Sequence, residues 1–400
     1  MTEPLNILIV SPTFPYPPSW GFGIRVYQLA RNLSARHKVT LLTYARADEM
    51  EYVEPLRQLI GDVRVVERPQ NRGLVKRLAQ LASIVSSSSY QVRDLHTREM
   101  QAAIDDLLTE GAFDIIQLES SQMCSFNYGT GSAVVLDEHN IEYELLQRMH
   151  EGERSWTRRV YNRGEYRKFR PVEQEAWRTV NGCVLTSERE EVIVRAHAPA
   201  TQVVVVPNGV DPEYFMPSGH EPTADTLMFN GLLSYRPNFD AAVYLIEEIL
   251  PRLHQVRPGV TLTIVGFGTP AELDSLRRPG VVVTGVVPDI RPYLEQAAVV
   301  VVPIRMGGGT RLKVIEALAM GKAVVSTTIG CEGLRVVDGE HLVKADDADS
   351  FASSVALVLA DQAKSEGLGR AGRTLMVNEY SWQRSTVQLE ELFRRLAPGV

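Results

Sequence analysis

Short apolar runs alternate with amphipathic stretches along almost the whole chain, and this alternation predicts parallel α/β sheets. The runs rich in valine, isoleucine and leucine predict strands at Leu5–Val10, Val39–Tyr44, Phe113–Leu118, Ala133–Leu136, Cys183–Ser187, Val203–Val206, Leu227–Phe229, Thr261–Val265, Val281–Val286 and Val299–Ile304. Apolar positions three and four apart predict helices at Ile24–Ala35, Ile141–Trp177, Asn238–His254, Ile290–Gln296, Thr310–Met320, Ser350–Ala360 and Trp382–Leu396.

The length of 400 residues suits two domains of ordinary size. Met216–Thr226 is rich in proline, serine, glycine and acidic residues and poor in apolar ones, which is typical of a linker. We therefore expect an N-terminal Rossmann-like domain over residues 1–220 and a C-terminal one over residues 221–381. A last helical segment follows at 382–400.

The stretch Val299–Val325 contains the clearest candidate binding site. A β-branched run, the glycines Gly307–Gly309, a helix and a second β-branched run form one βαβ unit. Ligands bind at such strand-to-helix turns, and the free amides of the helix favour phosphate. Arg311 and Lys313 oppose the helix dipole unless an anion sits there, and Glu316 could accept hydrogen bonds from sugar hydroxyls. The alternative is a solvated helix with ordinary surface charges.

Two features of the first domain are also candidates. The loop Ser11–Gly23 is long and rich in proline and glycine, and Gly21 and Gly23 would let the backbone approach a ligand closely. His139 follows the strand Ala133–Leu136, at the edge of a parallel sheet where ligands bind. The alternatives are a plain surface loop and a structural histidine.

Composition excludes several classes of function. The net charge of −7 argues against general nucleic-acid binding. Cys124, Cys183 and Cys331 show neither metal-ligand spacing nor a disulfide framework, which suits a reducing cytoplasm. Asp347 and Asp349 stand directly before a helix, where capping explains them without a metal. No apolar run reaches the roughly 18 residues of a spanning helix, so any membrane contact would be peripheral.

Two basic helical regions leave their role open. Leu74–Val85 has an apolar face beside arginine and lysine, which fits either a helix packed on its own domain or one lying on a membrane surface. Arg148–Arg170 is rich in arginine with interleaved glutamates. Its charges either pair along helices or form an acceptor channel or a surface for anionic lipid.

The segment Gly308–Gly321 resembles the donor-binding segment of family-4 retaining glycosyltransferases, and its variant resembles a bacterial branch associated with polysaccharide assembly. The resemblance implies the GT-B fold: two Rossmann-like domains facing across a cleft, with the acceptor on the N-terminal side and a nucleotide sugar in the C-terminal domain. It implies a last helix over residues 382–400 that crosses back to the first domain. The implied partners are a nucleotide-diphosphate sugar donor and a glycan, lipid-linked or small-molecule acceptor, with no other cofactor and no metal.

The family pattern has two glutamates eight positions apart, and this chain keeps one of them. Glu316 matches the second, which contacts the ribose, whereas Gly308 occupies the place of the first. The family's diphosphate-binding arginine and lysine are replaced by Leu232 and Pro237. We expect Arg311 and Lys313 to substitute for them.

Further positions follow from the resemblance. His139 matches a histidine near the donor sugar, so the implied catalytic residues are His139, Arg311 and Lys313, and Arg236 is a further diphosphate candidate. The implied donor-binding residues are Gly21, Gly23, Gly231, Gly266, Val287, Gly308, Gly309, Thr310, Leu312 and Glu316.

Rival interpretations come from two observations. Gly266–Ala271 satisfies a dinucleotide fingerprint, but the following strand does not end in the acidic residue that an NAD ribose requires. We interpret this segment as a turn against the nucleotide. The glycine at position 308 leaves open a non-catalytic nucleotide-sugar-binding protein, and the implied fold is shared with sugar-nucleotide epimerases and phosphorylases.

Overall fold

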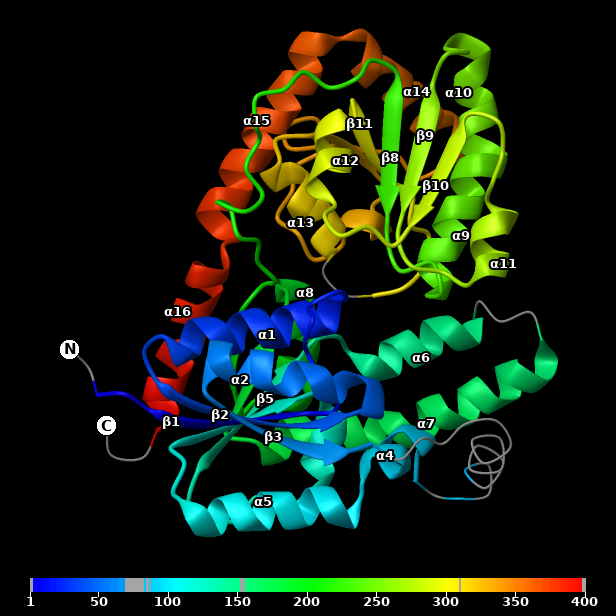
Figure 1. Ribbon diagram of the computed structural model, residues 1–400. Coiled ribbons are helices and arrows are strands. Elements are labelled where there is room, and N and C mark those ends of the chain that lie inside the picture. Colours follow the sequence, from blue (N-terminus) through cyan, green and yellow to red (C-terminus); the bar gives the residue numbers. More distant parts are fainter. Residues whose placement is uncertain are drawn as a thin grey trace. The chain divides into compact units, whose positions relative to one another are not determined.

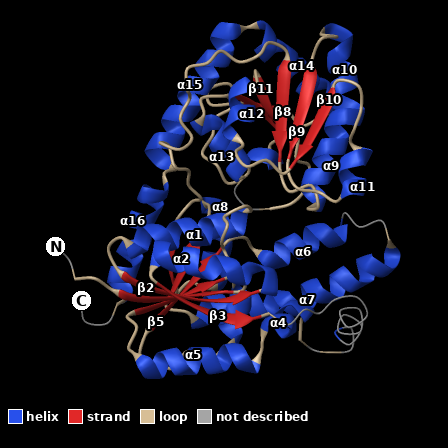
Figure 2. Cartoon of the chain, in the orientation of Figure 1, coloured by secondary structure: helices blue, strands red, loops and turns tan. Residues whose placement is uncertain are grey.

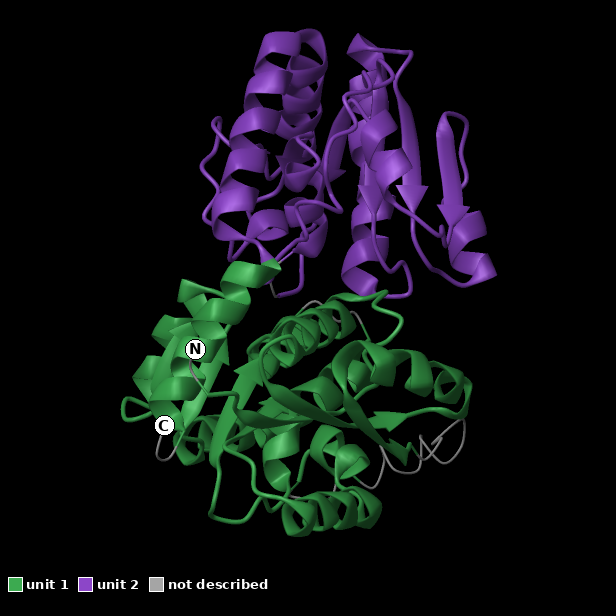
Figure 3. Cartoon of the chain, turned by 60° about the vertical axis from the view of Figure 1, so that its left-hand side comes forward, with its two compact units in different colours: residues 1–207, 382–400 green, residues 208–381 purple. Residues whose placement is uncertain are grey.

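The computed structural model describes residues 3–68, 83, 86, 88–151, 155–308 and 311–397. The chain divides into two units, each with its own parallel sheet and core (Figure 3). Unit 1 comprises Met1–Pro207 and Trp382–Val400, and unit 2 comprises Asn208–Ser381. In the described ranges no helix combines the length and apolarity needed to cross a bilayer.

Unit 1 contains a parallel sheet of seven strands in the order β3-β2-β1-β4-β5-β6-β7. The strands are β1 Asn6–Ser11, β2 Lys38–Ala45, β3 Asp62–Glu67, β4 Ile115–Glu119, β5 Ala133–Glu138, β6 Gly182–Leu185 and β7 Gln202–Val205. Residues Ile7–Val10 and Ile115–Ile116 are fully buried, as expected for central strands covered by helices on both faces. The strand order reverses between β1 and β4, which makes that edge the expected ligand site of the unit.

The helices of unit 1 include one from the end of the chain (Figure 1). They are α1 Gly21–Ser34, α2 Val53–Ile60, α4 Tyr90–Leu95, α5 Arg98–Glu110, α6 Glu142–Glu151, α7 Trp156–Thr179, α8 Glu188–His197 and α16 Trp382–Leu396, with short 3₁₀ turns η1 Ala47–Tyr52 and η2 Ser121–Ser125. Helix α16 packs on α1 and on the β6–β7 edge. It buries Leu389, Leu392 and Phe393, and Glu390 pairs with His37 and Arg36.

Unit 2 contains a parallel sheet of six strands in the order β10-β9-β8-β11-β12-β13. The strands are β8 Thr226–Asn230, β9 Thr261–Val265, β10 Val281–Gly285, β11 Val299–Val302, β12 Ala323–Ser326 and β13 Val343–Lys344. The helices are α9 Arg236–Tyr244, a π-helical turn η3 Leu245–Ile249, α10 Leu250–Val256, α11 Pro270–Ser275, α12 Arg291–Gln296, α13 Leu312–Ala319, a 3₁₀ turn η4 Ile329–Cys331, α14 Ala348–Ala360 and α15 Gln362–Glu379. The strand order reverses between β8 and β11.

The linker predicted at Met216–Thr226 is corrected by the structure, because this segment lies inside unit 2. The amide of Ser218 donates to Glu295 Oε1 at 3.1 Å, and the amide of Thr223 donates to the carbonyl of Gln296 at 2.9 Å. Its polar composition therefore reflects an exposed strap bonded to the end of α12. The chain passes between the units at 207/208 and 381/382 instead of at 220/221.

Other differences concern helix ends and elements without a clear pattern (Figure 2). Helix α1 begins at Gly21 instead of Ile24, and α13 begins at Leu312 instead of Thr310. The long helical region Ile141–Trp177 is two helices, α6 and α7. Several elements were not predicted, because their apolar runs are short or interrupted by charged residues: β3, β13, α2, α4, α5, α8, α11 and α15. Apart from Ser83, the basic segment Leu74–Val85 lies outside the described residues.

Candidate active site

The turns after β8 and β9 are pressed together at the strand-order reversal of unit 2. The amide of Gly231 donates to the carbonyl of Val265 at 3.0 Å. A Cβ atom on Gly266 would lie 1.9 Å from the carbonyl oxygen of Gly231, and Gly266 has a φ of +149°. Only glycine fits there, because a side chain would collide with backbone and would be strained in any case. At the site of unit 2, the backbone of the turn after β8 is therefore in direct contact with the backbone of the turn after β9.

Lys313 points into this turn from the first turn of α13. Its Nζ donates to Asn238 Oδ1 at 2.8 Å and lies 4.5 Å from the centre of the Phe229 ring. A Cβ atom on Gly231 would lie 2.7 Å from Nζ, so the glycine makes room for the ammonium group. Burial lowers the pKa of Lys313 to about 7, and the charge of Arg311 adds to this effect. In the protein without a ligand, keeping Lys313 charged therefore lowers the stability of the folded state.

Arg311 precedes α13 and is buried. Its Nη1 donates to the carbonyl of Gly308 at 2.7 Å. A Cβ atom on Gly307, whose φ is +102°, would lie 3.2 Å from Pro237 and 3.4 Å from Arg311 Nη2. Gly307 therefore lies against both Pro237 and the guanidinium of Arg311. The predicted site residues Gly309 and Thr310 lie outside the described residues.

Glu316 lies one turn after Lys313 on α13. Burial raises the pKa of Glu316 to about 7, and the charge of Lys313 opposes the rise only in part. Within the part of the chain that the structure describes, its carboxyl group accepts no hydrogen bond. A half-buried acid without a partner loses hydration that a ligand's hydroxyl groups would restore. The ammonium of Lys313 and this carboxyl thus present an anion-binding group and a hydroxyl-binding group on one helix.

The remaining predicted residues of unit 2 are placed as follows. Leu312 packs against the core, which excludes its side chain from polar contact with a ligand. Val287 lies in the turn after β10 and also packs on the core. Leu232 is 40% exposed, and Arg236 opens α9. The structure brings together Gly231, Gly266 and Lys313, with Gly308 and Arg311 nearby.

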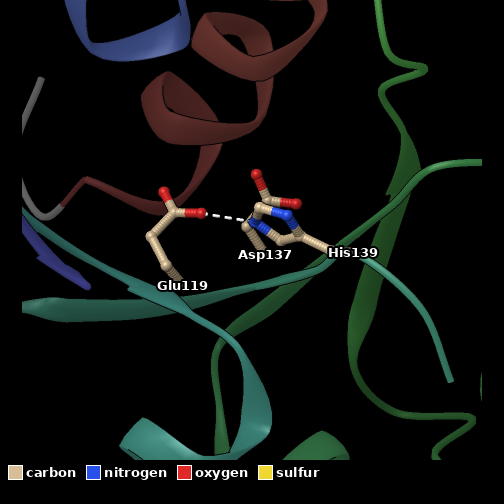
Figure 4. Close-up of side chains that lie close together, drawn as sticks. All are labelled: Glu119, Asp137 and His139. Carbon is tan, nitrogen blue, oxygen red and sulfur yellow. Dashed lines mark hydrogen bonds and ion pairs between the residues drawn. The ribbon is translucent and has the colours of Figure 1, made fainter. Parts of the chain in front are cut away.

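His139 follows β5 at the sheet edge of unit 1, beside the end of β4 (Figure 4). Its Nε2 lies 2.7 Å from Glu119 Oε2, and its ring stacks on Phe22 with centroids 4.2 Å apart. Both His139 and Glu119 are buried. Phe22 belongs to the first turn of α1, so three elements meet at the histidine.

Glu119, Asp137 and His139 place one ligand-type atom each within 4.8 Å of one another. That spacing would suit a divalent cation. However, Asp137 already pairs through both oxygens with Arg25, at 2.8 Å from Nη2, and both side chains are fully buried. The guanidinium supplies the positive charge that a metal would bring. We therefore interpret the cluster as an ion-paired network rather than a metal site.

Gly21 and Gly23 do not lie in the loop that the sequence analysis expected. Both belong to the first turn of α1. A Cβ atom on Gly23 would lie 3.1 Å from the indole nitrogen of Trp20, and Trp20 stacks on Phe22 at 5.2 Å. In this structure Gly23 accommodates an aromatic stack, and that stack continues to His139.

Asp347 caps α14, as predicted from sequence, and Asp349 lies in the first turn of that helix and pairs with Arg252 at 2.7 Å. Asp347 Oδ1 accepts from the amides of Asp349 and Ser350 at 3.0 and 2.9 Å. These hydrogen bonds lower the pKa of Asp347, as expected for an N-cap. All three cysteines are free thiols.

Several residues of the two sites were missed from sequence. Asn238 and Phe229 contact Lys313, and Glu119, Arg25 and Phe22 surround His139. Glu119 alone carried a signal, since it is an acid at the end of the predicted strand Phe113–Leu118. The others depend on strand order, which a single sequence does not reveal.

Two family models match the chain. The model described as glycosyl transferases group 1 matches residues 224–361, and the glycosyl transferase 4-like domain matches residues 21–209. Glycogen synthase of Mycobacterium tuberculosis is 29% identical over 194 residues, so the match spans less than half of that relative, 46% of each protein. Lipopolysaccharide 1,2-N-acetylglucosaminetransferase of Salmonella typhimurium is 22% identical over 416 residues, with 96% of this chain and 97% of that protein covered.

Solved structures support the fold. Sucrose-phosphate synthase of Thermosynechococcus elongatus superposes with a TM-score of 0.73 at 19% identity, covering 98% of this chain and 99% of the other. HepE of Anabaena, solved in complex with UDP and glucose, superposes with a TM-score of 0.67 at 15% identity, covering 98% and 99%. Two parallel α/β sheets with these neighbours confirm the predicted GT-B class of fold.

Proposed function

The chain belongs to the group 1 glycosyl transferases, and on that premise we propose that it transfers a glycosyl group from a nucleoside-diphosphate sugar to an acceptor hydroxyl. We expect the configuration at the anomeric carbon to be retained, as in the retaining family that the chain resembles. The Salmonella relative acts on lipopolysaccharide and the Anabaena neighbour was solved with UDP and glucose. These relatives support a hexosyl donor and a role in glycan or glycoconjugate synthesis.

Unit 2 would bind the donor nucleotide at the β8/β11 reversal. Negative charge grows on the diphosphate as the glycosidic bond breaks, so a cation there lowers the barrier more than it strengthens ground-state binding. Lys313 would supply that cation, with Arg311 beside it. Gly231 and Gly266 would let the phosphates approach the backbone.

Glu316 would accept hydrogen bonds from the ribose hydroxyls. The ribose does not change during the reaction, so Glu316 would contribute to donor affinity more than to turnover. In unit 1, His139 would act at the donor sugar, where an imidazole can stabilise the developing positive charge or a hydroxyl group.

The observation that carries this proposal is the pair Lys313 and Glu316, half-buried on one helix at the reversal of the strand order. Burial lowers the pKa of Lys313 and raises the pKa of Glu316, to about 7 in each case. A folded protein gains no stability from such a pair, and a ligand with a phosphate and adjacent hydroxyls would satisfy both groups.

Calorimetric titration with UDP, GDP, ADP and their common sugars tests the proposal. We expect one nucleotide series to bind, with Lys313→Met weakening it. A thermal shift should accompany binding, since a ligand at one hundred times its dissociation constant stabilises by about 2.7 kcal/mol. Absence of binding by every nucleotide would refute the assignment of the donor site.

A second candidate is a non-catalytic nucleotide-sugar-binding protein. Gly308 favours it, because this position lacks the carboxylate of the family pattern. The two functions are separated by release of nucleoside diphosphate with a broad panel of glycan and lipid-linked acceptors. Tight donor binding without release would favour the binding protein. Release that does not depend on acceptor would instead favour an epimerase.

The cellular setting of the proposed reaction is a further part of the proposal. A cytoplasmic enzyme with a peripheral contact at the inner membrane face would have access both to nucleotide sugars and to lipid-linked acceptors. The exposed arginines on α7, Arg158, Arg159, Arg163 and Arg167, support an anionic acceptor or surface. Sedimentation with anionic vesicles tests this assignment.

A further inference from the structure

Glu119 ends β4 at the strand-order reversal of unit 1 and is fully buried. The next residue, Ser120, has a φ of +97°, a conformation that costs a non-glycine residue energy. The amide of Ser120 donates to the carbonyl of Asp137 at 3.1 Å, which ties this turn to β5. The strained turn thus fixes where the carboxyl group of Glu119 lies.

Both oxygens of Glu119 have a defined partner. The side-chain nitrogen Nε2 of Gln117 donates to Oε1 at 2.6 Å, and His139 Nε2 lies 2.7 Å from Oε2. Burial and the charge of Asp137 raise the pKa of Glu119, while His139 and Arg25 oppose the rise. An ionised carboxylate only accepts hydrogen bonds. With Glu119 ionised, the contact therefore places a proton on Nε2 of the histidine.

The histidine ring is held in two directions. Glu119 holds it in its plane, and Phe22 covers one face at 4.2 Å. In the described part of the chain Nδ1 makes no hydrogen bond. Nδ1 is therefore the ring atom left for a ligand, as an acceptor in the neutral ring or a donor in the charged one.

We propose that Glu119 is a positioning residue, which keeps His139 protonated at Nε2 and reserves Nδ1 for the substrate. The inference rests on the proposed function for the role of His139 in turnover, but the geometry itself can be tested without any substrate. A glutamine at position 119 would occupy the same space. Its amide can accept from Nε2 or donate to it, so it would no longer fix the tautomer.

The chain contains a matched control. His37 Nε2 pairs with Glu390 on α16, also buried in unit 1. Glu390→Gln removes a carboxylate from a buried His–Glu pair, as Glu119→Gln does, but this pair does not lie at the end of β5. Any general effect of losing a buried His–Glu pair should appear in this variant too.

The first test is two-bond ¹H–¹⁵N NMR of the full chain labelled with ¹⁵N-histidine, at about pH 8, where ordinary histidines are neutral. His139→Gln assigns the signals of His139. We expect the wild type to show one tautomer with the proton on Nε2, Glu119→Gln to give a mixture, and Glu390→Gln to change only His37. A wild-type ring protonated at Nδ1, or an unchanged His139 spectrum in Glu119→Gln, would overturn the proposal. If Glu119→Gln does not fold, the wild-type spectrum alone decides.

The same sample tests the rival metal assignment. Manganese ions at low concentration broaden signals close to a bound ion. We expect no selective broadening of the His139 signals. Strong broadening of that residue alone would show that Glu119, Asp137 and His139 form a metal site rather than an ion-paired network.

The second test is kinetic and uses the donor and acceptor identified for the wild type. Misplacing a reacting group can cost on the order of 100-fold in rate, so we expect Glu119→Gln to lower kcat by about 10- to 100-fold without changing nucleotide affinity. Glu390→Gln should keep wild-type kcat. Wild-type turnover in Glu119→Gln would overturn the positioning role. If the wild type itself transfers no sugar, the proposed function fails while the NMR result still decides the geometry.

Discussion

Replacing Lys313 by methionine should stabilise the free protein and weaken nucleotide binding at the same time. The methionine retains the apolar stem against Phe229 but removes the charge. Lysine in an unfolded chain has a pKa near 10.5, and burial lowers it to about 7 here. Full withdrawal from water would make this a penalty of about 4 kcal/mol at neutral pH.

The expected gain is smaller than this limit. Lys313 keeps some exposure, and its hydrogen bond to Asn238 Oδ1 at 2.8 Å offsets part of the penalty. The variant also leaves the Asn238 oxygen without its donor. We therefore expect the free energy of unfolding to rise by about 1–2 kcal/mol at pH 7. Urea denaturation followed by circular dichroism measures it.

The effect has a defined pH dependence. Because the folded pKa of Lys313 is below the unfolded one, the unfolded state binds more protons between pH 7 and about 10. The wild type therefore gains stability relative to Lys313→Met as the pH rises through this window. The advantage of the variant should be largest below pH 7 and shrink above it.

Binding should change in the opposite sense. A charged hydrogen bond to phosphate is worth roughly 1.5–3 kcal/mol, so the dissociation constant of the bound nucleotide should rise by about 10- to 150-fold. An anion favours the protonated lysine, so wild-type affinity should fall as the pH rises above about 7. The variant should lack this dependence. Titration calorimetry at several pH values measures both effects.

Lys322 provides the control. It is a buried lysine whose pKa burial lowers to about 8, and its Nζ donates to the carbonyl of Glu295 at 2.9 Å, past the other end of α13. Lys322→Met should leave nucleotide affinity unchanged. If Lys313→Met is less stable than the wild type at pH 7 and binds nucleotide normally, Lys313 is a structural residue and the site assignment is wrong.

Three other predictions address the remaining groups. Glu316→Gln should raise the dissociation constant of the nucleotide by about tenfold with little change in kcat. Because burial raises the folded pKa of Glu316 to about 7, this variant should also be stabilised relative to wild type as the pH rises from 4.5 through 7. His139→Ala should lower kcat at least 10-fold with unchanged nucleotide affinity, and a loss of stability with normal turnover of the folded fraction would contradict its role. Asp347→Ala should lower the melting temperature by about 2–4 °C, because the helix loses its cap. The variant should stay active, and the wild type should stay active in EDTA. Loss of activity on chelation, with recovery on added magnesium, would contradict metal independence.

The sequence predicted the sheets well because buried parallel strands need continuous apolar runs. Thr261–Val265 and Trp382–Leu396 were predicted to the residue. Strand order was not predictable, and without it Arg25 and Asp137 could not be paired across 112 positions. The arginine lies on the buried side of α1, where a sequence pattern assigns it to solvent.

The candidate site of unit 2 was predictable where chemistry and local pattern coincide. Lys313 and Glu316 follow a glycine turn after a β-branched strand, and a cation at a helix start is itself unusual. Asn238 carried no such signal, since its role depends on α9 approaching α13. The linker at Met216–Thr226 failed for a related reason, because a polar strap on the surface of unit 2 has the composition of a linker.

The return of α16 to unit 1 affects how the protein is made. All of unit 2 precedes α16 in the chain, so the ribosome completes it before the residues that cover α1 and the β6–β7 edge exist. During that interval the nascent first unit carries an open apolar face, which Leu389 and Phe393 later fill. Unit 2, in contrast, is one uninterrupted segment and can fold as soon as it is synthesised. Synthesis that stops before α16 should therefore leave a folded second unit attached to an aggregation-prone first one.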